Sequence, residues 1–229
     1  MSLETATFLH ERTKIGHRRS LLGLGLCVAL VLLGIGFLDR PVSTWVHANL
    51  AGQRRAFDAL THIVDPLVPL STLGLLLAGL AALGGWRPSP RAKVLLAMAL
   101  SVTIVVTLKD QAKYAFGRLW PETWVDNNPS WIGTGSYGFF PFHGGRGWSS
   151  FPSGHMSVVT APAEVVRRCF ARWGWLAIAA VGLVAIGLLG ADYHFFSDIV
   201  AGTVVGWACG TGALAFVFGT FTLPDRGAP

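Results

Sequence analysis

Long apolar stretches, separated by short polar ones, recur along the whole chain. They lie at about residues 21–38, 66–86, 94–112, 154–170, 173–190 and 199–221. Each is close to the ~20 residues that an α-helix needs to cross roughly 30 Å of hydrocarbon. Because backbone groups cannot stay unpaired in lipid, runs of this length must be helical. The pattern therefore predicts an all-α, polytopic membrane protein with about six transmembrane helices, in a single domain over residues 1–229.

The segment 41–65 interrupts this series after the first span. It is polar enough to leave the membrane, yet it keeps apolar residues among its polar ones, which is typical of an amphipathic helix at the membrane surface. We therefore expect an interfacial helix or helical pair here. The first span follows several basic residues, is longer than a usual signal-peptide core and ends at Asp39 without a small-residue cleavage site. We interpret it as an uncleaved anchor behind a cytoplasmic segment, residues 1–19.

Composition and charge agree with a membrane protein. Hydrophobic residues make up 52% of the chain and charged residues 13%, with a mean hydropathy of +0.52, whereas about a quarter of a soluble domain is charged. The net charge is +6. When the N-terminus is placed in the cytoplasm, most Lys and Arg residues fall on the cytoplasmic side, as the positive-inside rule requires. Both termini are then expected inside and residues 115–152 outside, and no basic face remains for a nucleic acid.

Small residues in the last apolar run predict close helix packing. Gly202, Gly206 and Gly210 recur every four residues, and this spacing lets two membrane helices approach closely. The cysteines are three in number and have no paired spacing, so they indicate neither a disulfide framework nor a zinc finger.

With this topology, three polar patches meet at the exported edge of the membrane. They are residues 113–121, 151–155 and 194–198. The first two border an exported segment, about residues 113–152, that is long and rich in aromatic side chains, and long loops in compact domains tend to be functional. A single interfacial His or Lys is more often a solvated anchor. The convergence of all three patches is what indicates a functional site.

The middle patch has the features of an anion site at a helix start. Pro152 precedes a predicted helix that is opened by Ser153 and Gly154. Free backbone N–H groups and the positive end of the helix dipole favour a phosphate there, with Ser153 as a cap and Gly154 permitting close approach. His155 then lies in the first turn, where it can protonate a departing alkoxide as a general acid. The alternative role for His155 is that of a capping or interfacial histidine.

The last patch pairs a histidine with a carboxylate. His194 and Asp198 are four residues apart and therefore share one face if the turn is helical. A carboxylate on one imidazole nitrogen fixes the tautomer and leaves the other nitrogen free as a nucleophile. Asp198 also opens an apolar helix, where an ionisable group is a functional candidate. Its alternative role is a simple N-cap.

In this order, the three patches resemble the motifs of the type-2 phosphatidic acid phosphatase superfamily over roughly residues 94–210. The resemblance implies that Lys113, Ser153 and Gly154 hold the phosphate. It gives the roles of acid, nucleophile and orienting group to His155, His194 and Asp198 respectively. It further implies a phosphohistidine intermediate hydrolysed by water, no metal or other cofactor, and a bacterial inner-membrane protein whose site faces the periplasm.

The chain departs from the family pattern at two positions. Trp120 stands where one phosphate-binding arginine is expected, and Leu188, six residues before His194, stands where a second is expected. Such guanidinium groups stabilise the charge on a transferring phosphoryl group. Arg118 is a candidate replacement, because in an extended segment it shares a face with Trp120. Arg146, in the glycine-rich approach to Ser153, is the competing candidate.

Several functions fit these residues. The first is hydrolysis of a phosphate monoester or diphosphate on a lipid within the membrane, and the second is transfer of the phosphoryl group to an acceptor lipid by the same histidine. A third is phosphate binding without turnover, suggested by the two departures. His155, His194 and Asp198 also form a possible two-His, one-carboxylate metal site. The sequence does not name the lipid among phosphatidic acid, phosphatidylglycerol phosphate, polyprenyl diphosphate and lipid A phosphates, and it does not indicate an oligomeric state.

Overall fold

The computed structural model describes residues 22–124 and 127–219, and the regular elements within these ranges are helices. The chain is helical over residues 22–33 and continues through a π-helical segment, η1 (Gly34–Leu38). The following helices and 3-10 turns are α2 (Asp39–Leu50), η2 (Ala51–Gln53), α3 (Arg54–Thr61), η3 (His62–Val64), α4 (Leu67–Leu83), α5 (Pro90–Phe116), α6 (Trp131–Thr134), η4 (Arg146–Trp148), α7 (Gly154–Cys169), η5 (Ala171–Trp173), α8 (Gly174–Gly190) and α9 (Phe196–Phe218). The all-α prediction is confirmed for the described residues.

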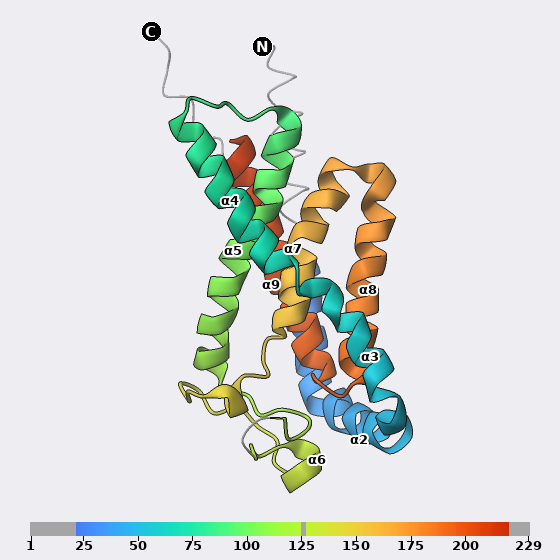
Figure 1. The fold of residues 1–229 in the computed structure, drawn as a ribbon. Helices are drawn as coiled ribbons and strands as arrows, with labels where there is room; N and C mark the ends of the chain where they lie inside the picture. Colours follow the sequence, from blue (N-terminus) through green and yellow to red (C-terminus); the bar gives the residue numbers. More distant parts are fainter. Residues whose placement is uncertain (1–21, 125–126, 220–229) are drawn as a thin grey trace, which may run out of the picture.

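Helix α7 lies at the centre of the bundle. It packs against α9, α5 and α8, while α4 packs on α5 and α3 packs on α8. The connections between α4 and α5 and between α7 and α8 lie at one end of the bundle (Figure 1). The long segment between α5 and α7, with α6, forms the opposite end (Figure 1). The segment predicted to be exported is therefore separated from the basic connections by the length of the bundle.

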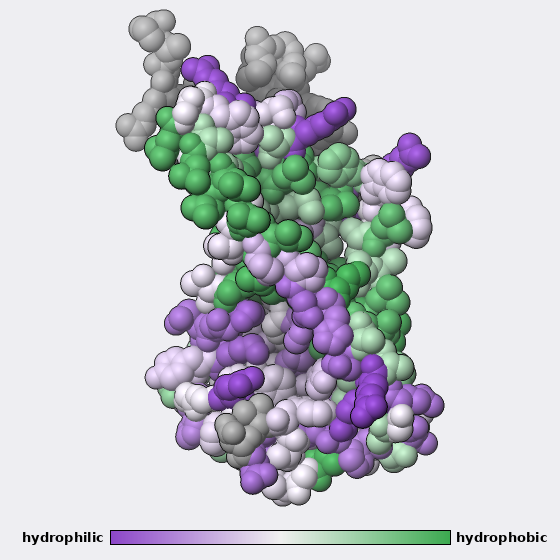
Figure 2. Space-filling view, in the orientation of Figure 1, coloured by the Kyte–Doolittle hydropathy of each residue, from purple (hydrophilic) through white to green (hydrophobic). Residues whose placement is uncertain are grey.

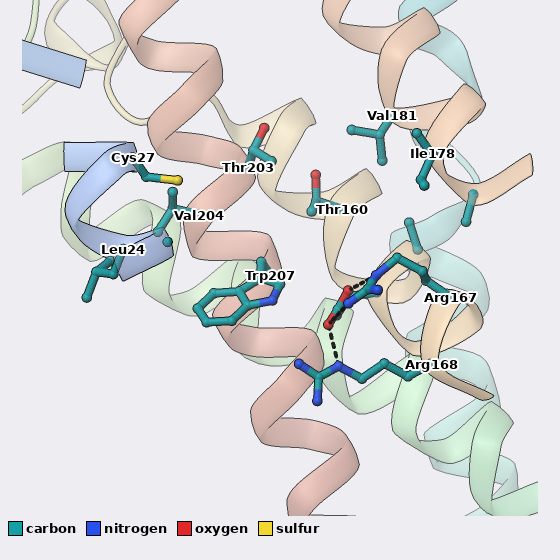
Figure 3. Close-up of a pocket in the computed structure, with 14 residues that line it drawn as sticks. Leu24, Cys27, Thr160, Arg167, Arg168, Ile178, Val181, Thr203, Val204 and Trp207 are labelled. Atoms are coloured by element: carbon teal, nitrogen blue, oxygen red, sulfur yellow. Dashed lines mark hydrogen bonds and ion pairs between the residues drawn. The ribbon is translucent and has the colours of Figure 1, made fainter. Parts of the chain in front are cut away.

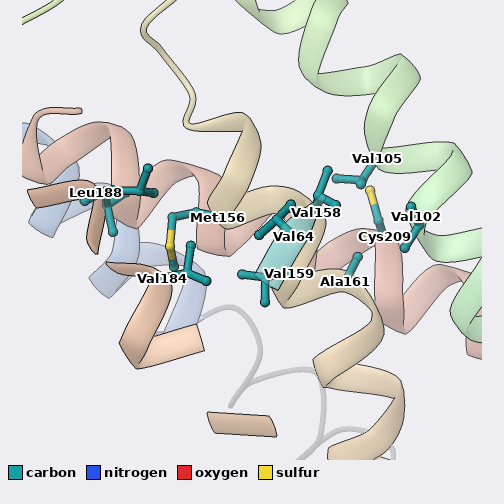
Figure 4. Packing of buried hydrophobic residues seen from close by; sticks show 11 residues of the cluster. Val64, Val102, Val105, Met156, Val158, Val159, Ala161, Val184, Leu188 and Cys209 are labelled. Carbon is teal, nitrogen blue, oxygen red and sulfur yellow. The ribbon is translucent and has the colours of Figure 1, made fainter. Parts of the chain in front are cut away.

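The core is built from branched apolar side chains of several helices. Val102 and Val105 of α5, Val158 of α7 and Val184 and Leu188 of α8 belong to one buried cluster (Figure 4). Leu188 is fully buried in it. Leu188, which stands where the second arginine is expected, is thus an apolar core residue and supplies no cation to a phosphate site.

Glycines hold α9 against α7, as the sequence predicts. A Cβ atom at Gly202, Gly206 or Gly210 would lie 2.4–2.5 Å from a backbone oxygen of Ser153, Ser157 or Ala161. Real Cβ atoms essentially never come so close, so the two backbones can lie at this separation only because these residues have no side chain. This contact places the start of α9 beside the start of α7.

Three helical stretches in the described part are long and apolar enough to cross a membrane: Leu22–Leu83, Pro90–Phe116 and Phe196–Phe218. Helix α8 is apolar but shorter. Large apolar side chains are exposed along the bundle, and α4 has no buried residue at all. On the face shown in Figure 2, hydrophobic residues gather over one part of the bundle, while hydrophilic residues cover the end formed by the segment between α5 and α7. An apolar belt of this kind suits lipid as solvent.

The expected number of six transmembrane helices is not confirmed. Helix α7 spans only 16 residues and carries Glu164, Arg167 and Arg168, so it is less apolar than its central position suggests. Residues 41–65 lie mostly in α2, α3 and the 3-10 turns beside them, which is the helical pair among the two expected arrangements. The expected cytoplasmic segment 1–19 lies outside the described residues.

Candidate active site

Lys113 lies in the last turn of α5. Ser89 caps the start of this helix by accepting a hydrogen bond from Ala92 N, and the helix ends at Gly117, whose φ of 58° is left-handed. A Cβ on Gly117 would lie 1.8 Å from the carbonyl oxygen of Phe140, so glycine is required there both by its conformation and by the close approach. In the last turn, Lys113 Nζ donates to the carbonyl of Ser149 at 2.6 Å. The lysine is thus anchored to the segment that leads into α7.

The start of α7 is capped as predicted. The Oγ of Ser153 accepts a hydrogen bond from Met156 N, and Ser153 N donates to the carbonyl of Asp198 at 3.0 Å. Ser153 is completely buried and lies outside the cavity described below. Gly154 does line it, and a Cβ at Gly154 would come within 3.1 Å of Lys109 Cδ. Glycine therefore allows lysine side chains of α5 to lie against the first turn of α7.

His194 lies in the turn between α8 and α9, with its Nδ1 atom directed at Asp198. The distance from Nδ1 to Asp198 Oδ2 is 3.4 Å, and the distance to Ser150 Oγ is 3.5 Å. Both oxygens are able to accept a proton carried on Nδ1, so the pair favours the tautomer in which Nε2 is unprotonated. Burial lowers the pKa of His194 below its usual value, although the hydrogen bond and charge of Asp198 act in the opposite direction. The imidazole is therefore neutral near pH 7.

Asp198 is held from several sides. Its Oδ1 accepts a hydrogen bond from Arg118 Nη1 at 2.5 Å, and its Oδ2 accepts from Ser150 Oγ at 2.6 Å and from Phe195 N at 3.1 Å. Asp198 is the third residue of α9 and accepts this last bond from the N-cap residue, Phe195, so the alternative role of N-cap itself belongs to Phe195. A carboxylate fixed in this way is suited to orient the imidazole of His194.

The structure corrects the expectation that Arg118 binds phosphate. Its side chain is fully buried, with Nη1 donating to Ser197 and Asp198 and Nη2 donating to Asp39 and Tyr137. The guanidinium lies behind the carboxylate of Asp198 and does not line the cavity. The segment pairs through isolated bridges as an extended chain would. The Arg118 side chain nevertheless meets the carboxylates of Asp39 and Asp198, whereas the Trp120 ring reaches His194.

Trp120 occupies the place that an arginine was expected to fill. Its ring centroid lies 5.0 Å from that of His194, and Lys113 Nζ lies 5.4 Å from the indole ring. Its Nε1 donates to the carbonyl of Arg146 at 2.7 Å. The indole therefore packs on the predicted nucleophile and also holds the segment that carries Arg146.

These side chains surround one cavity of about 790 Å³. Of the eight residues predicted for the site, five line it: His155, His194, Lys113, Gly154 and Arg146. Asp198 lies directly behind His194, whereas Ser153 and Arg118 are buried in the surrounding structure. The sequence patches are thus brought together, although not every residue in them faces the cavity.

The sequence analysis missed three contributors. Lys109, one turn before Lys113 on α5, also lines the cavity, with its Nζ 2.6 Å from Asp110 Oδ1. Its spacing of four residues from Lys113 was a usable signal. Ser150 and Asp39 carry no such signal, because they reach Asp198 and Arg118 only through tertiary contacts.

A second cavity, of about 530 Å³, lies elsewhere and contains none of the predicted site residues. It is bordered by the helix at residues 22–33 and by α7, α8 and α9, with Trp207 and Val204 on one side and Ile178 on the other (Figure 3). Arg167 and Arg168, which both form ion pairs with Glu164, lie at one end (Figure 3). Its two arginines are paired with Glu164, which already offsets part of their charge.

The predicted metal alternative used His155, His194 and Asp198. The group of metal-ligating side chains that the described residues do bring together is a different one, formed by His47, Glu122 and Asp192. Burial is the main cause that raises the pKa of Asp192, to about 7.

The fold and the cavity define the class of protein. It is an all-helical protein with helices that are long and apolar enough to cross a membrane, and a cavity lined by ionisable side chains lies at one end of its bundle. Comparison with known families gives the identity. The family model of the PAP2 superfamily matches residues 91–221, more than half of the chain, and the chain belongs to this superfamily. Its members are generally phosphatases, which supports phosphatase-type activity on phosphate esters. No curated protein and no solved structure matches the chain.

Proposed function

We propose that this protein is a membrane phosphatase that hydrolyses a phosphate monoester or diphosphate on a lipid, through a phosphohistidine intermediate on His194. The observation that carries the proposal is the cavity that His155 and His194 line together with cationic side chains. Lys109, Lys113 and Arg146 outnumber the two carboxylates of the lining, Asp65 and Asp110. Two imidazoles beside such cations suit a nucleophile and an acid acting on one phosphoryl group.

Phosphate binding is assigned to the cations of the cavity and to the start of α7. The first backbone N–H groups of a helix have no partner within it and favour an anion. Lys109 and Lys113 approach this helix start from α5, and Arg146 approaches from the segment before it. Together they replace the charge that Trp120 and Leu188 do not supply.

The proposed chemistry has two steps. In the first, Nε2 of His194 attacks phosphorus, the bond from phosphorus to the lipid oxygen breaks, and His155 gives its proton to the departing oxygen. A bound phosphate dianion favours the protonated form of His155 that this step needs. In the second step, water attacks the phosphohistidine, His155 accepts a proton from that water, and inorganic phosphate leaves with His194 regenerated. Asp198 keeps the imidazole of His194 oriented throughout.

A lipid substrate and an exported site are part of the proposal. The apolar belt of the bundle supports a lipid substrate, since a phosphate on a lipid is presented where such a belt ends. The basic residues Arg87, Arg91 and Lys93 lie in or near the connection between α4 and α5, at the end of the bundle away from the segment between α5 and α7. By the positive-inside rule this supports a cytoplasmic position for that connection and a periplasmic position for the cavity in a bacterial inner membrane.

The test is phosphate release by the protein purified in detergent, assayed on a panel of lipid phosphates and diphosphates. We expect turnover that resists EDTA and is inhibited by vanadate, and we expect His194→Gln to abolish it. His143→Gln is the matched control, because His143 packs on Trp148 outside the cavity. Full activity of His194→Gln would refute the proposal. A newly phosphorylated lipid without free phosphate would identify a transferase, and tight substrate binding without single-turnover release would identify a non-catalytic member.

A further inference from the structure

A cluster of metal-ligating side chains lies outside the proposed active site. It is formed by His47 of α2, Glu122 of the segment between α5 and α6, and Asp192 of the turn between α8 and α9. One ligand atom from each residue lies within 4.8 Å of the others. Three elements that are far apart in the sequence therefore present one imidazole and two carboxylates to a common point.

We propose that His47, Glu122 and Asp192 bind a divalent transition-metal ion of the zinc type, which fastens the turn carrying His194 to α2 and to the segment between α5 and α6. Imidazole nitrogen together with carboxylate oxygen is a ligand set for zinc-like ions, with water completing the coordination. This goes beyond the proposed phosphatase function, since the ion is assigned no step in that reaction.

The distances suit an ion. Zinc binds nitrogen and oxygen ligands at about 2.0–2.2 Å in tetrahedral geometry, so two of its ligand atoms are about 3.4 Å apart. The atoms of the cluster need to close by at most about 1.4 Å from their outer limit of 4.8 Å, while Nδ1 of His47 and Oε1 of Glu122, which are in direct contact, need to move apart. Rotation of the His47 side chain, which is 45% exposed, allows such a movement and leaves a path for the ion to enter.

Neighbouring groups hold the ligands without using all of their atoms. Ser43 Oγ donates to Asp192 Oδ2 at 3.2 Å, and Arg54 Nη2 donates to Glu122 Oε1 at 2.7 Å. Nδ1 of His47 contacts the same Oε1 atom. Oδ1 of Asp192 and Oε2 of Glu122 take no hydrogen bond from the described residues and remain for the ion. Partners of this kind commonly orient metal ligands from outside the coordination sphere.

Charge gives an independent reason for an ion at this place. Asp192 is 2% exposed, has a left-handed φ of 55° and makes no ion pair within the described residues. A buried carboxylate without a cation is costly. Arg54 contacts Glu122 rather than Asp192. A divalent ion would neutralise the two carboxylates together, including that of Asp192, which forms no ion pair with any described residue.

The chain offers a matched control in His62. This histidine also lies between two carboxylates, but Asp65 contacts its Nδ1 at 2.7 Å and Asp58 contacts its Nε2 at 3.4 Å. The two ring nitrogens point in opposite directions, so those carboxylates cannot converge with one nitrogen on a single ion. His62→Ala should therefore leave metal binding unchanged, whereas His47→Ala should remove it.

The experiment uses the full chain, purified in detergent without a histidine tag, stripped with EDTA and titrated with zinc chloride. We expect one zinc per chain by elemental analysis and a melting temperature raised by several degrees. His47→Ala and Asp192→Asn should lose both effects, while His62→Ala and the cavity variant His194→Ala keep them. Binding that survives His47→Ala, or that disappears in His194→Ala, would overturn the proposal, as would a wild-type chain that takes up no zinc. Because His47 is partly exposed, its variant tests the site even if Asp192→Asn does not fold.

Discussion

Replacing Arg118 by methionine is the most informative single change, because it separates a buried positioning role from a phosphate contact. The guanidinium is fully buried and pairs with Asp39 at 2.6 Å and with Asp198 at 2.5 Å. Removing it leaves two carboxylates at 0% side-chain exposure without their cation. Breaking a buried ion pair in this way costs about 3–5 kcal/mol.

That loss should lower the melting temperature by on the order of 10 °C, since 1 kcal/mol shifts a chain of this size by about 2–4 °C. Because Asp198 loses one of its fixed partners, His194 is less well oriented, and we expect kcat to fall at least tenfold. KM should stay near the wild-type value, since Arg118 does not face the cavity. Adding Asp39→Asn should recover part of the stability by removing one unpaired charge.

The assay combines thermal unfolding in detergent with steady-state phosphate release, and Arg146→Met is the matched control. Arg146 lines the cavity, so its variant should raise KM and leave the melting temperature unchanged. The reasoning would be refuted if Arg118→Met raised KM at an unchanged melting temperature and kcat, because that is the behaviour of a phosphate ligand.

Four further outcomes are expected. Lys109→Met should raise KM severalfold in steady-state assays with little change in melting temperature; an unchanged KM would remove Lys109 from the phosphate site. Trp120→Arg should tighten vanadate inhibition by up to about tenfold, or about 1.4 kcal/mol, and weaker inhibition would show that the indole itself is needed. His194 must be neutral to attack and burial lowers its pKa, so the acid limb of kcat/KM, corrected for substrate ionisation, should lie below about pH 6.5; an acid limb above pH 7 would contradict this. Gly206→Val should lower the melting temperature, because its Cβ would lie 2.5 Å from Ser157 O, whereas Gly212→Val, with nothing within 4 Å, should not; equal shifts would argue against close packing of α9 on α7.

The apolar pattern predicted the helical class well because lipid leaves the backbone no alternative. It was less reliable for helix ends and for α7. Helix α5 continues to Phe116 through a polar last part, since Gly117 rather than loss of hydrophobicity ends it. Helix α7 is enclosed by α5, α8 and α9, so packing rather than its own hydrophobicity fixes its place.

The positions of the site residues were predictable where they depend only on spacing within one helix or turn. Lys113, Gly154 and His155 lie at helix ends, and His194 lies four residues before Asp198 at the start of α9, so their patches could be placed on a common edge. The interactions of Arg118 could not be foreseen, because Asp39 is 79 residues away and Asp198 is 80 residues away in the sequence. Contacts over such separations depend on how the helices pack, which the periodicity of a single chain does not specify.

The central claim is that His194 becomes covalently phosphorylated during turnover. Rapid acid-free quenching of the enzyme with a lipid substrate that carries radiolabelled phosphate, followed by mass spectrometry, measures this directly. We predict label on His194 alone, stable to alkali and lost in acid, absent from His194→Gln and retained in His143→Gln. Phosphate release at the wild-type rate with no label on His194 at any time point would contradict the account.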